Sequence, residues 1–323
     1  MKCLERFIAG VAGAVCITIS TAGISQTFPA KPLRMILALG GGAEVLARLV
    51  AQKSGESLGQ PMVLETQSGA GGAMGAQMVA RAAPDGYTIL FAASNSQIYH
   101  AFLSRSVLYD PIKDFTPITR VGQAVLCVVV NPAAPFGSFK EFTDYARRNP
   151  GKVSFGTSGI GTTHHLAAEL IKQLAGIDMV HVPYKGGGQV LTDLVGGQIP
   201  MAFTILATAL PHVKAGKMKI MAVVNDRRYH TIAEVATLRE MLPGFEMPPG
   251  WMGLFGPAGL TTPVQRRLNT ELAKALNHPD VRLKGDELGM VMDTSTPEEL
   301  AAELKRDIGT VSRIVKAAGI QPE

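Results

Sequence analysis

Four glycine-rich turns each follow a short apolar run and precede a helical pattern. They include residues 40–42 (Gly40, Gly41 and Gly42), 69–72, 156–161 and 186–188. A helix that opens on such a turn leaves backbone N–H groups without partners, and these groups bind anions without a charged side chain. A single glycine turn is ordinary turn chemistry. Four of them, spread over both halves of the chain, predict a cleft lined by anion-binding backbone.

Polar side chains accompany these turns and are candidates for ligand contact. At the third turn they are Thr157, Ser158, Thr162 and Thr163, with the backbone of Gly159, and the polar loop after an expected strand adds Ser94, Asn95 and Ser96. Hydroxyls can donate to a carboxylate beside a helix N-terminus. Their alternative role is to cap the helix. Tyr184, with Lys185, either reaches the cleft or forms a turn with the glycines that follow.

Enzyme and metal motifs fail at specific positions. Residues 156–160 resemble a nucleophile elbow, but Ile160 stands where the last glycine is needed. Residues 69–74 miss the dinucleotide spacing at Met74, and the chain has no phosphate-binding P-loop motif. His164 and His165 are neighbours on an expected helix and point in different directions, with no Glu-x-x-His partner. We predict a protein without catalysis, metal or cofactor.

The first 25 residues have the layout of a secretory signal peptide. Lys2 and Arg6 precede an uncharged apolar stretch at 7–19, and small residues follow up to Ser25, where we expect cleavage. The apolar stretch is too short to span a bilayer, which argues against the alternative of a membrane anchor. A lipoprotein signal at Cys16 is disfavoured because Val15 precedes it. The expected location is the periplasm.

The mature chain of about 298 residues is long enough for two domains. Cys127 is its single cysteine and lies in an apolar run, so we expect a small buried hydrophobe. Without the signal peptide, 29 basic and 25 acidic residues leave a net charge of +4. These charges are scattered, whereas nucleic-acid binding needs a concentrated basic face. The mild positive charge suits a small anionic ligand.

Apolar periodicity predicts an α/β fold with mostly parallel sheets. Strands are expected at 33–39, 87–92 and 153–157, and helices at 45–58, 73–83, 138–148, 165–174, 263–276 and 297–317. Ser138 with Glu141 forms a capping-box pattern. In such folds ligands bind beyond the carboxyl ends of the strands. Trp251 lies in a segment rich in proline and glycine at 242–260, where we expect packing at a hinge rather than stacking on a ligand.

Eight short motifs carry a family resemblance. They are Gly-Ala-Gly-Gly at 69–72, Ala-Pro-Asp-Gly-Tyr-Thr at 83–88, Asn-Pro-Gly-Lys at 149–152, His-Val-Pro-Tyr-Lys-Gly-Gly at 181–187, Leu-Val-Gly-Gly-Gln at 194–198, Leu-Pro-His-Val-Lys-Ala-Gly-Lys at 210–217, Gly-Leu-Phe-Gly-Pro-Ala-Gly at 253–259 and Lys-Ala-Ala-Gly-Ile at 316–320. Together they resemble the periplasmic solute-binding receptors of tripartite tricarboxylate transporters, the Bug or TctC family. The match extends over essentially the whole mature chain.

The resemblance implies a two-lobed, flytrap-like periplasmic-binding-protein fold of type II with an interlobe cleft. Residues 26–124 and 250–323 would form the first lobe and 125–249 the second, joined by segments near 122–130 and 250–256. The family holds a carboxylate through main-chain amides, hydroxyls and water. The implied partners are a small organic carboxylate and, transiently, inner-membrane transporter subunits, with the receptor itself a monomer. His165 matches a common family histidine, and a ligand contact and a structural role both stay open for it.

Two departures from the family pattern fall in expected pocket loops. The first loop reads Ala43-Glu44 where the family usually has Thr-Asp, and Thr204 stands where it often has Asp. Loss of an acid at Thr204 removes a partner for a ligand ammonium, so we expect a carboxylic acid without an amino group. A ligand-presenting protein of a sensory system and an exported enzyme acting on a small acid are the alternatives.

Overall fold

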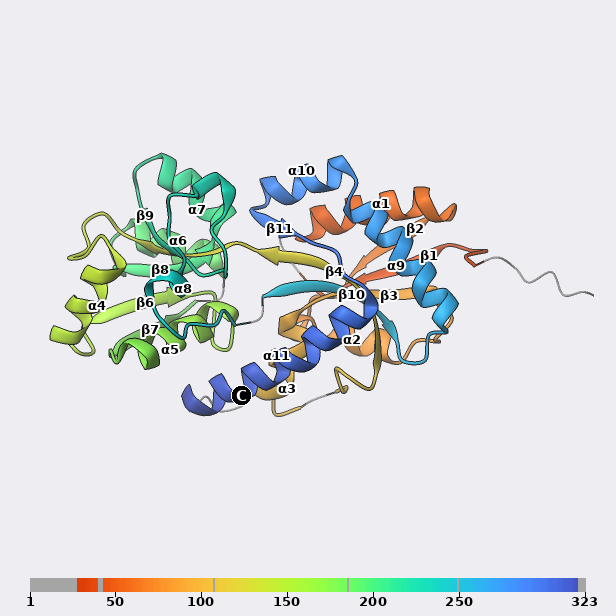
Figure 1. Ribbon diagram of the computed structural model, residues 1–323, viewed down its shortest axis with the longest axis horizontal. Helices are drawn as coiled ribbons and strands as arrows, with labels where there is room; N and C mark the ends of the chain where they lie inside the picture. The colour runs from red at the N-terminus through yellow and green to blue at the C-terminus, as the bar shows by residue number, and fades with distance from the viewer. Residues whose placement is uncertain (1–27, 40–42, 107, 185, 249, 319–323) are drawn as a thin grey trace, which may run out of the picture.

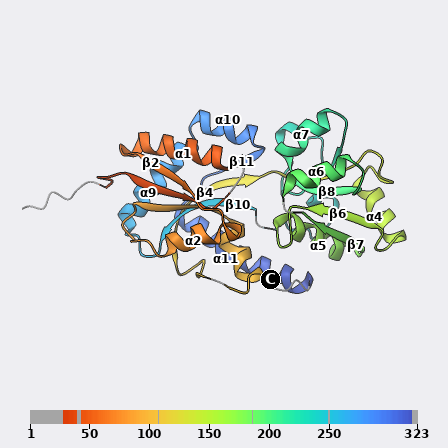
Figure 2. The same cartoon turned by 180° about the vertical axis from the view of Figure 1, so that it is seen from behind.

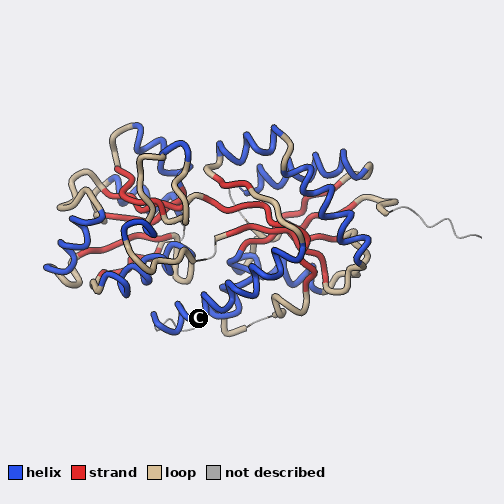
Figure 3. The backbone as a smooth tube through the Cα atoms, in the orientation of Figure 1, coloured by secondary structure: helices blue, strands red, loops and turns tan. Residues whose placement is uncertain are grey.

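The computed structural model describes residues 28–39, 43–106, 108–184, 186–248 and 250–318. The expected signal peptide, Gly40, Gly41 and Gly42 therefore lie outside the described residues. The chain forms two lobes, each around its own β-sheet, with extended segments passing between them (Figures 1 and 3). The α/β, two-lobed prediction is confirmed. Within the described ranges, we find no helix of the length and apolarity needed to cross a membrane.

The first lobe is built on a six-stranded sheet. Its order is β11 (Met290–Met292), β4 (Phe115–Ala124), β10 (Trp251–Pro257), β3 (Thr88–Ala93), β1 (Leu33–Leu37) and β2 (Met62–Thr66). β1 pairs in parallel with β2 and β3, whereas β10 is antiparallel to both β3 and β4. β11 closes the edge, antiparallel to β4. Four strands thus run in one direction, as predicted, and β10 and β11 run against them.

The second lobe repeats this plan with five strands. The order is β7 (Met179–Pro183), β6 (Val153–Thr157), β8 (Met201–Ile205), β5 (Leu126–Val130) and β9 (Lys219–Val223). Only β5 opposes the other strands of this sheet. The opposed strands β5 and β10 are the ones that arrive from the other lobe, and each is inserted into the interior of its new sheet. Both crossings are therefore anchored by pairing on two sides.

Helices cover both faces of each sheet. The first lobe carries α1 (Ala43–Leu58), α9 (Thr262–Leu276) and α10 (Pro279–Glu287) on one face, and α2 (Ala73–Ala80) and α11 (Pro297–Ala318) on the other. The second lobe has α4 (Phe139–Arg148) and α5 (Thr163–Ala175) on one face, and α6 (Gly187–Val195) and α7 (Leu206–Lys214) on the other. Shorter helical segments are η1 (Ala70–Gly72), η2 (Asn95–Tyr99), α3 (His100–Leu103), η3 (His230–Ile232) and α8 (Leu238–Met241).

Local signals in the sequence gave correct elements. Ser138 and Glu141 form the predicted capping box at the start of α4. Cys127 is fully buried, and burial raises the pKa of its thiol to about 12. Trp251 is 1% exposed, and its Nε1 donates to Asp307 Oδ2 at 2.8 Å. Trp251 packs in the core at the start of β10, where the chain re-enters the first lobe, and its expected role at a hinge rather than on a ligand stays a prediction.

The helix α5 links the lobes through one side chain. Leu166 is fully buried, and it packs with Trp251 and Leu300 in the core of the first lobe although α5 follows a strand of the second. The helix α11 runs from the first lobe past α5 (Figure 2) and packs against it. The N-terminus of α5 is thereby held at the junction of the lobes.

Val125 is the residue between β4 and β5, and it is hydrogen-bonded to both lobes. Its N–H donates to Gly289 O of the first lobe at 2.8 Å, and its carbonyl accepts from Leu206 N of the second at 2.8 Å. The buried Asn225 side chain completes the backbone hydrogen bonds on either side. Its Oδ1 accepts from Leu126 N at 2.7 Å and its Nδ2 donates to Ala124 O at 3.1 Å.

We predict that Asn225→Leu lowers the free energy of unfolding by at least about 2 kcal/mol, because two buried backbone groups lose their partners. Asn225→Asp retains the acceptor for Leu126 N, so its loss should be smaller. Urea titrations of the purified protein measure both. The exposed pair Arg266–Glu298 provides the control, since Arg266→Ala should cost less than about 1 kcal/mol. If Asn225→Leu and Arg266→Ala lower the free energy of unfolding equally, the two Asn225 hydrogen bonds do not stabilise the crossing.

Candidate functional site

The carboxyl ends of strands from both sheets meet at the crossing. Ala93 at the end of β3 pairs with Met252, one residue from the start of β10, and Ile205 at the end of β8 pairs with Leu126. β4 ends at Ala124 and β5 begins at Leu126, so Val125 alone separates the two sheets along the chain at this point. Ligands of α/β folds bind at this kind of edge.

A cavity of about 370 Å³ lies at this meeting point. Its lining comes from both lobes and from the crossings, and consists of Leu39, Ala43, Ala93, Ser94, Asn95, Ala124, Leu126, Ser158, Thr162, Thr163, His164, Ile205, Ala207, Thr208, Gly250, Met252, Leu288 and Met290. Such a volume is within the usual range for a small-molecule site. A ligand that fills the cavity would contact both lobes.

The first turn of α5 faces this cavity. Thr162 is the N-cap, and its Oγ1 accepts from His165 N at 3.3 Å. The glycine at 161 (φ 70°) closes the preceding turn against Leu103 of the first lobe. A helix of thirteen residues carries partial positive charge at its N-terminus, so an anion in the cavity is stabilised there.

No Asp, Glu, Lys or Arg lines the cavity in the part of the chain that the structure describes. Its polar groups are hydroxyls, the Asn95 amide and the His164 imidazole. Burial lowers the pKa of His164 to about 4, so the ring is neutral at pH 7. The rest of the wall is apolar, with the larger side chains Leu39, Leu126, Ile205, Met252, Leu288 and Met290. The cavity offers uncharged donors to a polar group and an apolar surface to a carbon skeleton.

Five of the sequence-predicted site residues line this cavity: Ser94, Asn95, Ser158, Thr162 and Thr163. They come from two loops that are more than sixty positions apart in sequence, and the fold brings these loops face to face. Tyr99 of the first lobe is hydrogen-bonded to Thr163 of the second. The prediction that the two polar loops share one cleft agrees with the structure, and their contact with a ligand stays a prediction.

Three predicted residues, Thr157, Gly159 and His165, support the 157–163 loop through their hydrogen bonds and are absent from the cavity lining. Thr157 Oγ1 lies 2.6 Å from His181 Nε2, and Gly159 O accepts from Thr162 Oγ1 at 2.8 Å. His165 Nδ1 accepts from Gly161 N at 3.0 Å, and its ring stacks on His181 with centroids 4.1 Å apart. The structural alternative for His165 therefore fits the geometry.

The other predicted residues also lie outside the lining. Glu44 is 41% exposed and pairs with Arg48 at 2.8 Å. Ser96 is buried and donates to Ala93 O at 3.2 Å, and Tyr184 donates to Asp193 Oδ2 at 2.8 Å. Thr204 is buried and shares a hydrogen bond with Thr208. In each case a neighbouring group on the protein takes the polar atom that was expected to face the ligand.

The prediction that all four glycine turns line one cleft is wrong, since among the described turns one borders the cavity. The 156–161 turn borders the cavity. Gly72, with φ 94°, is packed so closely on Ala38 that a Cβ would lie 2.2 Å from Ala38 O, so this turn is sealed by protein. Gly186, Gly187 and Gly188 have open space around them and do not line the cavity. Gly40, Gly41 and Gly42 lie outside the described residues.

Sequence reasoning missed His164, Thr208 and the apolar wall. His164 was considered only as a metal ligand beside His165, and no group of three or more His, Cys, Asp or Glu in the described ranges is arranged to hold a metal ion. Thr208 lies in the first turn of α7, where no glycine marks the site. The apolar wall read as ordinary strand and helix positions, because its residues become neighbours only when the two lobes meet.

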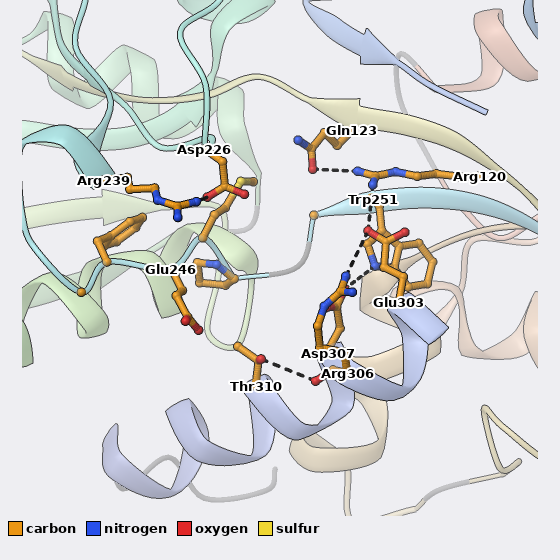
Figure 4. A pocket seen from close by; sticks show the side chains of 15 residues that line it. Arg120, Gln123, Asp226, Arg239, Glu246, Trp251, Glu303, Arg306, Asp307 and Thr310 are labelled. Carbon is orange, nitrogen blue, oxygen red and sulfur yellow. Dashed lines mark hydrogen bonds and ion pairs between the residues drawn. The ribbon is translucent and has the colours of Figure 1, made fainter. Parts of the chain in front are cut away.

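A larger cavity of about 640 Å³ lies beside the connecting segments (Figure 4). Arg120, Glu303, Arg306 and Asp307 face it from the first lobe, and Arg239, Asp226 and Glu246 from the second (Figure 4). Arg120 contacts Glu303 at 2.8 Å, and the carboxylates outnumber the arginines by four to three. Such a lining disfavours an anion, so we place the candidate site in the smaller cavity.

Comparison with protein families places this chain. The protein-family model for the "Tripartite tricarboxylate transporter family receptor" matches residues 46–319 of this chain. The UPF0065 protein in the tcbD-tcbE intergenic region of Pseudomonas sp. (strain P51) is 33% identical over 94% of this chain and 91% of its own length. Protein BugT of Bordetella pertussis is 31% identical over 91% of this chain and 94% of its own length.

Solved structures agree with the fold and carry ligands. Rpa4515 of R. palustris with adipate superposes with a TM-score of 0.79 at 29% identity, covering 92% of this chain and all of that chain. MatC of Rhodopseudomonas palustris with bound malate has a TM-score of 0.73 at 30% identity, covering 89% of this chain and all of that chain.

The buried histidines make stability depend on pH. Burial lowers the pKa of His181 to about 4, whereas an unfolded histidine titrates near 6.5. Between these values the unfolded state binds more protons, so stability falls as pH falls. We predict that His181→Gln loses less free energy of unfolding than wild type between about pH 7 and about pH 4.5. Denaturant titrations at both values test this. Gln52→Ala, which removes an exposed side chain without a titratable group, should leave the wild-type pH dependence unchanged.

Proposed function

Because the chain belongs to the tripartite tricarboxylate transporter family of receptors, we propose that it captures one small organic carboxylate between its lobes and delivers it to a transporter of that type. The protein acts in the periplasm as a monomer after removal of the signal peptide. The exposed surface of the closed form contacts the transporter subunits transiently. Binding without turnover is its whole activity.

The observation that carries this proposal is the interlobe cavity at the N-terminus of α5. A carboxylate placed there accepts hydrogen bonds from N–H and O–H groups, which stabilise it without a buried cation. Omitting the cation avoids the desolvation cost that a buried ion pair would add. The ligands named for two related structures, adipate and malate, are both small carboxylic acids.

The lining also supports an acid without an amino group. A ligand ammonium needs a carboxylate partner, and no acidic side chain lines the cavity in the described ranges. Thr204, where the family often has an acid, is buried and bonded to Thr208, so the preference follows from the lining as a whole and not from this position. The apolar wall favours a ligand with a substantial hydrocarbon part.

Capture couples to closure because the site is divided between the lobes. A ligand that touches Asn95 on one side and Ser158 on the other binds the closed state more tightly than the open one, which shifts the population toward closure. A dissociation constant in the micromolar range corresponds to about −8 kcal/mol, which a few charge-assisted hydrogen bonds can supply.

Calorimetry against adipate, malate, benzoate, citrate, glutamate and arginine tests the proposal. We expect at least one of the acids without an amino group to bind, and the two amino acids to bind more weakly. X-ray scattering should then show a smaller radius of gyration with the bound acid, and chromatography should recover that acid unchanged. A flat response to every acid, or consumption of the bound acid, would refute the proposed function.

The Asn95 side chain gives a direct test of the site. Asn95→Ala removes an amide that lines the cavity from the first lobe, and we expect about tenfold weaker binding of the best acid. Gln52→Ala removes an exposed amide on α1, away from the cavity, and should bind like wild type. If both variants keep wild-type affinity, the ligand does not touch the first lobe at Asn95.

A further inference from the structure

One side chain in the cavity has a buried polar atom with nothing to bond. His164 is the second residue of α5, and its Nδ1 lies 2.9 Å from Ser158 Oγ. Its Nε2 is buried and has no hydrogen-bond partner among the described residues. A buried donor or acceptor without a partner destabilises the unliganded protein, because it has lost its hydrogen bonds to water. Because Nε2 itself has no surface exposed to the cavity, a ligand oxygen reaches it only when the ring turns, and the new hydrogen bond then offsets the cost of the missing partner.

The neighbouring histidines, His165 and His181, already have partners for ring nitrogens within the protein. His165 Nδ1 accepts from Gly161 N at 3.0 Å, and its Nε2 lies 3.7 Å from Glu169 Oε1. His181 Nε2 is 2.6 Å from Thr157 Oγ1. Both rings lie in the layer beneath the 157–163 loop, whereas His164 lines the cavity itself. Of these three rings, His164 alone combines a place in the lining with a nitrogen that has no partner in the described structure.

The chemistry of the ring decides what that nitrogen can do. Burial keeps the imidazole neutral at pH 7, and no charged side chain in the described ranges lines the cavity. A neutral imidazole has one N–H donor and one acceptor nitrogen, and the partner of one nitrogen sets the role of the other. The Ser158 hydroxyl can donate to Nδ1, which leaves the proton on Nε2. A carboxylate oxygen can then accept from Nε2.

We propose that His164 contacts the bound acid by donating from Nε2 to one of its oxygens, and that Ser158 positions the ring by donating to Nδ1. The inference rests on the proposed function, since it names a residue of the same site. It assigns the contact to His164 and not to His165. It also gives Ser158 an indirect role, because its hydroxyl hydrogen is used by the histidine and not by the ligand.

Substitutions that mimic one nitrogen or the other test this assignment. The amide nitrogen of glutamine reaches about as far as Nε2, whereas that of asparagine reaches about as far as Nδ1. With the panel acid that wild type binds most tightly, we expect His164→Gln to stay within a few-fold of wild-type affinity. His164→Asn should bind about tenfold or more weakly. His230→Gln, at an exposed position, serves as the control and should bind like wild type.

A double-mutant cycle isolates the role of Ser158. Ser158→Ala should weaken binding in the wild-type background and have little effect in the His164→Gln background, because no imidazole is left to position. Equal effects of Ser158→Ala in both backgrounds would overturn the positioning role. Equal affinity of His164→Asn, His164→Gln and wild type would overturn the contact while the proposed function stands. Wild type that binds no acid would overturn both.

A spectroscopic measurement covers the case in which a variant folds poorly. Nitrogen-15 spectra of the wild-type histidines with bound acid should show the His164 ring neutral, with the proton on Nε2. A ring protonated on Nδ1 alone would contradict the proposal regardless of the variants. The unliganded melting temperature of each variant shows whether its loss of affinity is a loss of folded protein.

Discussion

The residue Val125 is hydrogen-bonded to both lobes at once, and the site depends on this arrangement. Its N–H bonds to Gly289 and its carbonyl to Leu206, while Asn225 satisfies the backbone on either side. The ends of β3, β4 and β8 meet next to Val125, and the cavity lies at this junction of the two sheets.

The helix α5 is the second element that fixes how the two lobes meet at the cavity. Leu166 is buried in the first lobe, one turn after the Thr162 cap that faces the cavity. Hydrophobic packing thereby aims the N-terminus of α5 at the junction of the lobes. Because the helix supplies partial positive charge from its backbone, the protein can attract an anion without a cationic side chain in the described lining. Selectivity then depends on shape and hydrogen-bond geometry more than on net charge.

The sequence predicted the fold well because its signals are local. Apolar periodicity and the capping box at Ser138 depend on residues close in sequence, and these elements are in the structure. The polar loops at 94–96 and 157–163 were found because strand ends in α/β folds converge. Glu44 and Thr204 lie outside the lining, and their polar atoms bond to Arg48 and Thr208, because the sequence does not show which of several possible partners a side chain uses. The sealing of Gly72 by Ala38 is a contact between residues far apart in sequence, which no local pattern shows.

The two adjacent histidines illustrate the limit most clearly. A motif match selects His165, yet its ring is stacked on His181 and bonded to Gly161, so its hydrogen-bonding capacity supports the loop. His164 has no motif behind it, and it lines the cavity because successive residues on a helix point about 100° apart. One position along α5 therefore separates a residue that supports the loop from a residue that lines the cavity.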